Sequence, residues 1–247
     1  MSLLAAERIK LVTTRSPWWC AVIALALAIG ISVLFTLHGG GDRPLTVANT
    51  QLGVQQFGFV VVMVMAALAV TTEYRFGTIK ATFTAAPNRF AVLLAKTGLV
   101  AFGAAVIGEI AAFGALGAAI LVRPSAHLSL ATPADWRAVA GSGLVYAIAA
   151  VLALAVGTLI RHTAGAIALL LIYALIGEPL IAQIPGIGPG IHRWLPFAMA
   201  DNFQGATGRA VVPGGAALSP WWSLAYFAGI AVLLSIIAMV VANRRDA

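Results

Sequence analysis

The chain has 247 residues, of which 61% are hydrophobic and only 9% are charged, and its formal net charge is +7. A water-soluble domain carries about 25% charged residues, so this composition excludes an ordinary soluble protein and indicates a single integral membrane domain. The one cysteine, Cys20, excludes an internal disulfide and a cysteine-cluster metal site. The basic residues are scattered among apolar runs, which disfavours a nucleic-acid-binding surface.

Residues 1–16 carry the first charges of the chain. On a helical wheel, Glu7, Lys10 and Thr14 share one face, opposite a mostly apolar face. We therefore expect an amphipathic helix that lies on the membrane surface, with a merely charged tail as the alternative. The next stretch, CAVIALALAIGISVLFTL, is longer than the apolar core of a signal peptide, so we expect it to remain as the first membrane span.

Six apolar runs are long enough to cross a bilayer, which takes about 20 residues in a helix. The fourth and fifth runs are separated only by RHT at 161–163, and Arg161 favours a tight turn because a charge at mid-bilayer is costly. The sequence thus predicts an all-α polytopic membrane fold. Its predicted spans are 17–37, 51–72, 91–122, 138–160, 163–183 and 220–242.

The basic residues also predict the orientation of these spans, because cytoplasmic loops are enriched in Lys and Arg. With both termini inside, ten basic residues face the cytoplasm and five face outward. The inner ones are Arg8, Lys10, Arg15, Arg75, Lys80, Arg89, Lys96, Arg161, Arg244 and Arg245; the outer ones are Arg43, Arg123, Arg137, Arg193 and Arg209.

The stretch TTEYRFGTIKATFTAAPNR, residues 71–89, is an unusually charged connection between two spans. Gly77 is suited to the left-handed conformation that ends a helix, and Thr78 can cap a new short helix. That helix ends before Pro87, which disfavours helical conformation in the residue before it. The sequence predicts a compact helix–turn–helix within the loop 73–90, and a loop that serves only as a topology signal is the alternative.

This stretch resembles the first cytoplasmic loop of ABC-2 type permeases, the membrane subunits of ATP-driven exporters. The layout is also similar, with a surface helix, six spans and re-entrant segments between the fifth and sixth. In that family the loop is the coupling helix, which fits a cleft in the nucleotide-binding subunit. The matching residues here are Glu73, Arg75, Gly77, Thr78, Pro87, Arg89 and Lys96. The coupling residues implied are Glu73, Tyr74, Arg75, Gly77, Thr78, Lys80, Phe83 and Arg89.

The resemblance also implies partners. The chain has no G-x-x-x-x-G-K-[ST] motif, so it is not expected to hydrolyse ATP itself. ATP and Mg would be bound by a separate P-loop ATPase subunit, and two permease copies, or two related permeases, would pair because such ATPases work as dimers. Drugs, antibiotics or lipids are the cargo classes implied, exported across a bacterial cell membrane, as in multidrug efflux.

Two carboxylates lie within predicted spans, Glu109 in the third and Glu178 near the outer end of the fifth. A charge in the bilayer centre is expensive, so both are candidate cargo-pathway residues, with a structural role as the alternative for each. A proton-coupled transporter that uses Glu109 is the rival function, and a non-transporting scaffold or sensor is another. The four histidines are scattered and do not predict a metal site.

The long connection after the fifth span, residues 184–220, is rich in Pro and Gly yet contains Trp194, Leu195, Phe197 and Met199. These residues are too apolar for a solvated linker, so we expect short helices that dip back toward the membrane. Trp18, Trp19, Trp221 and Trp222 begin the first and last spans, where tryptophan commonly anchors a helix at the membrane surface.

Overall fold

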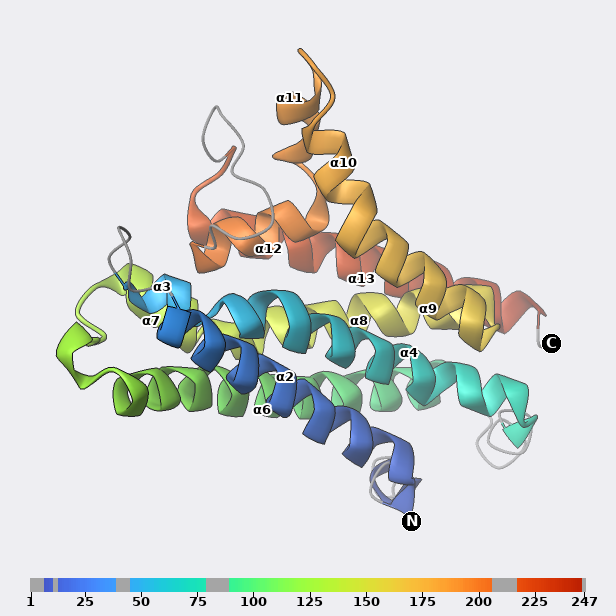
Figure 1. The fold of residues 1–247 in the computed structure, drawn as a ribbon. Coiled ribbons are helices and arrows are strands. Elements are labelled where there is room, and N and C mark those ends of the chain that lie inside the picture. Colours follow the sequence, from blue (N-terminus) through green and yellow to red (C-terminus); the bar gives the residue numbers. More distant parts are fainter. Residues whose placement is uncertain (1–6, 11–12, 39–44, 79–88, 206–216, 246–247) are drawn as a thin grey trace.

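The computed structural model describes residues 7–10, 13–38, 45–78, 89–205 and 217–245, and the regular structure within these ranges is helical (Figure 1). The longer helices are α2 (Arg15–His38), α4 (Phe59–Arg75), α6 (Arg89–Val122), α8 (Ser142–Ile160), α9 (Thr163–Ile172) and α13 (Pro220–Arg245). The shorter ones are α3 (Val47–Thr50), η1 (Val54–Gly58), η2 (Pro124–Ala126), α7 (Pro133–Val139), η3 (Tyr173–Gly177), α10 (Glu178–Ala182), α11 (Gly188–His192) and α12 (Pro196–Gln204).

Six helical segments are long and apolar enough to cross a membrane, which confirms the predicted all-α polytopic fold. Two of them are composite: η1 continues directly into α4, and α9 continues through η3 into α10. The six segments are Arg15–His38, Val54–Arg75, Phe90–Val122, Ser142–Ile160, Thr163–Ala182 and Pro220–Arg244.

The fourth spanning helix begins at Ser142 rather than at the predicted residue 138, because a separate helix, α7, precedes it. Thr132 and Asp135 form a capping box in which each side chain binds the backbone N–H of the other, and Pro133 occupies the first helical position. These residues start a new helix ahead of the span. The second spanning helix likewise begins at Val54, after the short α3 that Thr46 caps.

Helix α8 lies at the centre of the bundle and packs against α4, α6 and α13, while α2 packs across α4 and α6 (Figure 1). Small residues on α6 allow close approach to α8: Ala104 is fully buried, and a Cβ at Gly108 would lie 2.8 Å from the Tyr146 ring. The Tyr146 hydroxyl donates to the Val54 carbonyl at 2.6 Å, which ties α8 to the π-helical turn η1.

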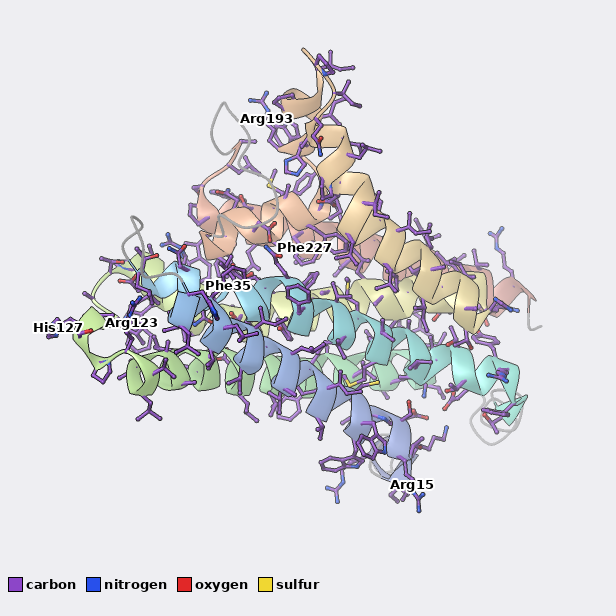
Figure 2. The ribbon with its side chains drawn as sticks, viewed as in Figure 1. Arg15, Phe35, Arg123, His127, Arg193 and Phe227 are labelled. Atoms are coloured by element: carbon purple, nitrogen blue, oxygen red, sulfur yellow. The ribbon has the colours of Figure 1, made fainter. Side chains whose placement is uncertain are left out.

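The charged and apolar side chains are distributed as a membrane bundle requires. Figure 2 shows Arg15 near the N-terminal end of the bundle and Arg123 with His127 at the opposite end. Phe227 lies inside, where it is fully buried and packs edge-on against Phe197 with ring centroids 6.1 Å apart. The surface between these ends exposes many large apolar side chains, as expected for a protein whose solvent is lipid.

The connection between the last two spans contains the short helices predicted from its composition. Helix α12 buries Phe197, Met199 and Phe203 and packs against α13. It ends at Gly205, whose φ of 65° is the left-handed conformation that glycine adopts readily.

Candidate functional site

The second span ends in a sharp turn at Gly77. Helix α4 stops at Arg75, the Phe76 N–H donates to the Thr72 carbonyl at 2.9 Å, and the Gly77 N–H donates to the Tyr74 carbonyl at 3.3 Å. Gly77 has a φ of 70°, so the left-handed break predicted at this position is present. The Thr78 hydroxyl donates back to the Glu73 carbonyl at 3.4 Å. The chain therefore leaves α4 through a defined turn.

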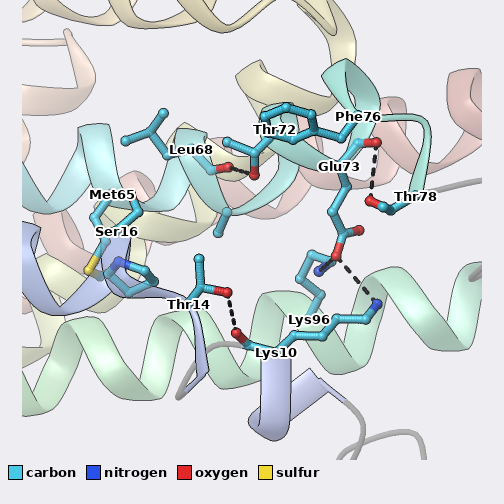
Figure 3. A pocket seen from close by; sticks show the side chains of 12 residues that line it. Lys10, Thr14, Ser16, Met65, Leu68, Thr72, Glu73, Phe76, Thr78 and Lys96 are labelled. Carbon is cyan, nitrogen blue, oxygen red and sulfur yellow. Dashed lines mark hydrogen bonds and ion pairs between the residues drawn. The ribbon is translucent and has the colours of Figure 1, made fainter.

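Four charged side chains meet beside this turn, and Figure 3 shows three of them, Lys10, Glu73 and Lys96. The Lys96 ammonium, from α6, lies 2.5 Å from Glu7 Oε2 and 2.9 Å from Glu73 Oε1. The Lys10 ammonium lies 2.8 Å from Glu7 Oε1 and 3.3 Å from the same Glu73 oxygen. We call these four residues the charge cluster. The charge cluster joins the N-terminal segment, the part of the chain before α2 that carries Glu7 and Lys10, to the end of α4 and the start of α6.

The charge cluster is largely shielded from solvent and its formal charges cancel. The side chains of Lys96 and Glu7 are 4% and 3% exposed, and that of Glu73 is 12% exposed, whereas Lys10 is 39% exposed. Burial by itself would raise the pKa of the Glu7 carboxyl, but the two adjacent ammonium groups hold that pKa below its ordinary value. Burial likewise opposes the charge on Lys10, yet bonding to Glu7 and Glu73 raises the Lys10 pKa.

A cavity of about 410 Å³ opens beside the charge cluster. Figure 3 shows that it lies between the N-terminal segment and α4, with Glu73 and Lys96 at one side. Apolar side chains from α4, including Met65 and Leu68, form much of its wall. The turn at Gly77 thus borders a partly polar recess at the end of the bundle that bears both termini.

The turn between α8 and α9 also reaches the end of α4. Arg161 ends α8 in a left-handed conformation with a φ of 58°, and the His162 ring accepts from the Gly165 N–H at 3.1 Å, so His162 caps α9. These two residues make the tight turn predicted at this position. The Arg161 guanidinium lies 4.9 Å from the centre of the Tyr74 ring, a cation–π contact that joins the two loops.

The structure describes only some of the other residues that are predicted to couple to the ATPase. Arg75 is exposed, with its guanidinium 5.6 Å from the Phe76 ring centre. Lys80, Phe83 and the predicted short helix lie outside the described residues, and Arg89 begins α6 but its side chain is not described. The sequence places Glu7 and Lys10 on one helix face but does not indicate that they bind Glu73 and Lys96.

Glu109 lies half-buried on α6, facing the start of α8. Its Oε1 lies against the backbone of Gly143, in the first turn of α8, where N–H groups have no partner within the helix. Gly143 has no Cβ, and this allows the approach. Glu109 therefore contacts a helix N-terminus, and its predicted place in a cargo pathway remains a prediction.

Glu178 is almost fully buried, and both of its oxygens are occupied. Oε1 accepts from the Phe197 N–H and Oε2 from the Ala198 N–H, each at 3.0 Å. These are the second and third residues of α12, whose N-cap, Leu195, offers no side-chain acceptor. Glu178 thus caps α12 from the end of the fifth span, which is the structural alternative weighed from the sequence.

Within the described residues, no three His, Cys, Asp or Glu side chains come together as a metal site would require. The features that stand out are the charge cluster, the Gly77 turn beside it and the two loops that meet there. Residues 3–177 match the family described as ABC-2 family transporter protein. The chain belongs to the ABC-2 transporter family. None of the curated proteins compared with the chain matches it.

As an ABC-2 family member, the chain is a multi-pass membrane protein and the permease component of an ABC-type transport system. The matched residues include all four members of the charge cluster, the Gly77 turn and the turn at Arg161. They end at Gly177, the last residue of η3, so α10, α11, α12 and α13 lie beyond the match.

Proposed function

We propose that this ABC-2 permease exports hydrophobic or amphipathic cargo, such as a drug, an antibiotic or a lipid, using ATP hydrolysed by a separate P-loop subunit. The observation that carries the proposal is the charge cluster beside Gly77. It fastens the N-terminal segment, α4 and α6 together at the point where the chain enters the predicted coupling helix. A partner that displaces residues 79–88 would then move these segments as one unit.

A loop that served only as a topology signal would need basic residues alone. Here two carboxylates are buried opposite two lysines, which costs desolvation energy and adds little net stability. Such an arrangement is better explained by a need for fixed geometry, which a lever that transmits force requires. The Arg161–Tyr74 contact extends the same unit to the turn between α8 and α9.

In this proposal ATP and Mg are bound by the partner ATPase, and two permease copies, or this chain with a related permease, form the membrane part. ATP-driven closure of the ATPase pair would pull on residues 78–86 and rock the attached spans, which gives alternating access. The protein would lie in a bacterial cell membrane with both termini in the cytoplasm.

The decisive experiment is to purify the tagged full chain from its native membrane and ask whether a P-loop ATPase accompanies it. The complex, reconstituted in vesicles, should transport with vanadate sensitivity. Transport that resists vanadate but collapses with a protonophore would instead support a proton-coupled transporter that uses Glu109. Neither ATPase nor transport would indicate a scaffold or sensor.

The orientation can be tested separately. Single cysteines at Thr82 and Gly215, each in a Cys20→Ser background, should react with an impermeant thiol reagent from opposite sides of the membrane. Labelling of both positions from the same side would contradict the six-span topology with cytoplasmic termini.

A further inference from the structure

A second cavity, of about 530 Å³, lies at α7, at the end of the bundle away from both termini (Figure 1). It is formed where α7, the start of α8, the end of α12 and the start of α13 meet. The residues that define it are Thr132, Trp136, Arg137, Leu144, Phe203 and Trp221. None of them belongs to the charge cluster or to the Gly77 turn.

Arg137 brings a positive charge to this cavity, and no carboxylate among the described residues forms an ion pair with it. Its Nε is buried without a hydrogen-bond partner, and the ion pairs found among the described residues do not include it. The nearby Asp135 is committed to the helix cap, because its Oδ2 accepts from the Thr132 N–H at 2.9 Å and from the Thr132 hydroxyl at 2.7 Å. These bonds lower the Asp135 pKa, so this carboxylate stays ionised while serving the cap.

The opposite wall of the cavity is aromatic and fixed in place. Phe203 is fully buried and packs edge-on against Trp221, with ring centroids 5.2 Å apart. The Gln204 side chain donates to the Ser142 hydroxyl at 2.9 Å, which holds the end of α12 against α8. Trp136 and Trp221 are 51% and 62% exposed, as tryptophans at the lipid headgroup level commonly are.

Anchoring at the membrane surface accounts for the two tryptophans but not for a cavity with an unneutralised arginine between them. We propose that this cavity binds an anionic phospholipid of the adjacent leaflet. A phosphate oxygen accepts hydrogen bonds from the Arg137 guanidinium, which suits phosphate geometry better than an ammonium does. The upper part of an acyl chain lies against Trp136 and Trp221. A lipid fits better than a free anion because the cavity joins a cation to apolar walls at headgroup depth.

The test uses the full chain in detergent, with binding of dihexanoyl phosphatidylglycerol followed by native mass spectrometry. Dihexanoyl phosphatidylcholine, with the same chains and no net charge, is the comparison lipid. Arg137→Gln should weaken binding of the anionic lipid about 10- to 100-fold, the loss expected for a charge-assisted hydrogen bond. The matched control is Arg193→Gln, since Arg193 is exposed on the α11 side and does not line the cavity. It should bind like the unaltered protein.

Two further measurements keep the test decisive if Arg137→Gln folds poorly. Leu144→Trp fills the cavity from α8 while Arg137 itself is kept, and it should also weaken binding of the anionic lipid. Inorganic phosphate at millimolar concentration should not displace the lipid. Equal binding of both lipids, equal effects of the Arg137 and Arg193 changes, unaltered binding by Leu144→Trp, or ready displacement by phosphate would each overturn the proposal.

Discussion

Replacing Lys96 with Met tests whether the charge cluster holds the N-terminal segment on the bundle. Met keeps most of the apolar stem but leaves Glu7 and Glu73 with one ammonium group, that of the partly exposed Lys10. Removing one partner from a buried ion pair costs about 3–5 kcal/mol. Local release of residues 7–16 should therefore become roughly two to three and a half orders of magnitude more frequent.

Hydrogen–deuterium exchange of the N-terminal peptide measures this release directly, because amides exchange when the segment opens. Lys10→Met is the matched control. The Lys10 ammonium contacts the same two carboxylates, but because Lys10 is partly exposed, its removal should cost only about 0.2–1 kcal/mol. Adding Glu7→Gln to Lys96→Met should restore much of the protection, since it removes a carboxylate left without its partner. Equal effects of the two lysine changes, or no change in exchange, would refute the reasoning.

Three further predictions concern the turn, the helix cap and pH. Gly77→Val should cost about 1–2 kcal/mol in the left-handed turn and abolish cargo-stimulated ATP hydrolysis, whereas Gly117→Val, at a helical position with open space, should leave hydrolysis unchanged. Glu178→Ala should speed exchange at the start of α12, with a loss of about 0.5–2 kcal/mol; unchanged exchange would contradict the cap. The lowered Glu7 pKa means that its stabilisation is present above 4.5 and lost as pH falls through the lowered value. The raised Lys10 pKa means that its stabilisation is present below 10.5 and lost as pH rises through the raised value. After correction for intrinsic exchange rates, protection of the N-terminal peptide should therefore be constant between about pH 5 and 10.

The sequence predicted those features that depend on local pattern. The lengths of the apolar runs predicted six spans, and the glycine at the end of the second run predicted the left-handed turn at Gly77. The capping box at Thr132 has a sequence signal, since Thr and Asp stand three residues apart around a proline, but α7 was not predicted and the start of the fourth span was placed at 138. The π-helical turns η1 and η3 have no comparable signal in the local sequence. They form together with contacts between distant residues, such as the hydrogen bond from Tyr146 to the Val54 carbonyl.

The charge cluster and the Glu178 cap could not be predicted because their partners are distant in sequence. Glu7 and Lys96 are separated by 89 positions, and Glu178 binds N–H groups 19 and 20 residues away. An unpaired charge in an apolar sequence indicates that a partner must exist, but it does not identify the partner. Only the packing of α6 against the N-terminal segment and of α12 against the fifth span does so.

Glu109 and Glu178 both lie against helix N-termini, yet they differ in whether the contact requires a carboxylate. Glu178 uses both oxygens to accept two N–H groups, so a carboxylate is required for the cap itself. Glu109 lies against the backbone of one residue, Gly143, and a glutamine, which has nearly the same shape, could lie there too. An ionisable group that the local structure does not need, kept within a spanning helix, favours a role for Glu109 in transport. Glu109→Gln should therefore leave assembly and ATPase association intact while changing transport or cargo preference in reconstituted vesicles. Wild-type transport of several chemically different cargoes would show instead that Glu109 serves only to hold α6 against α8.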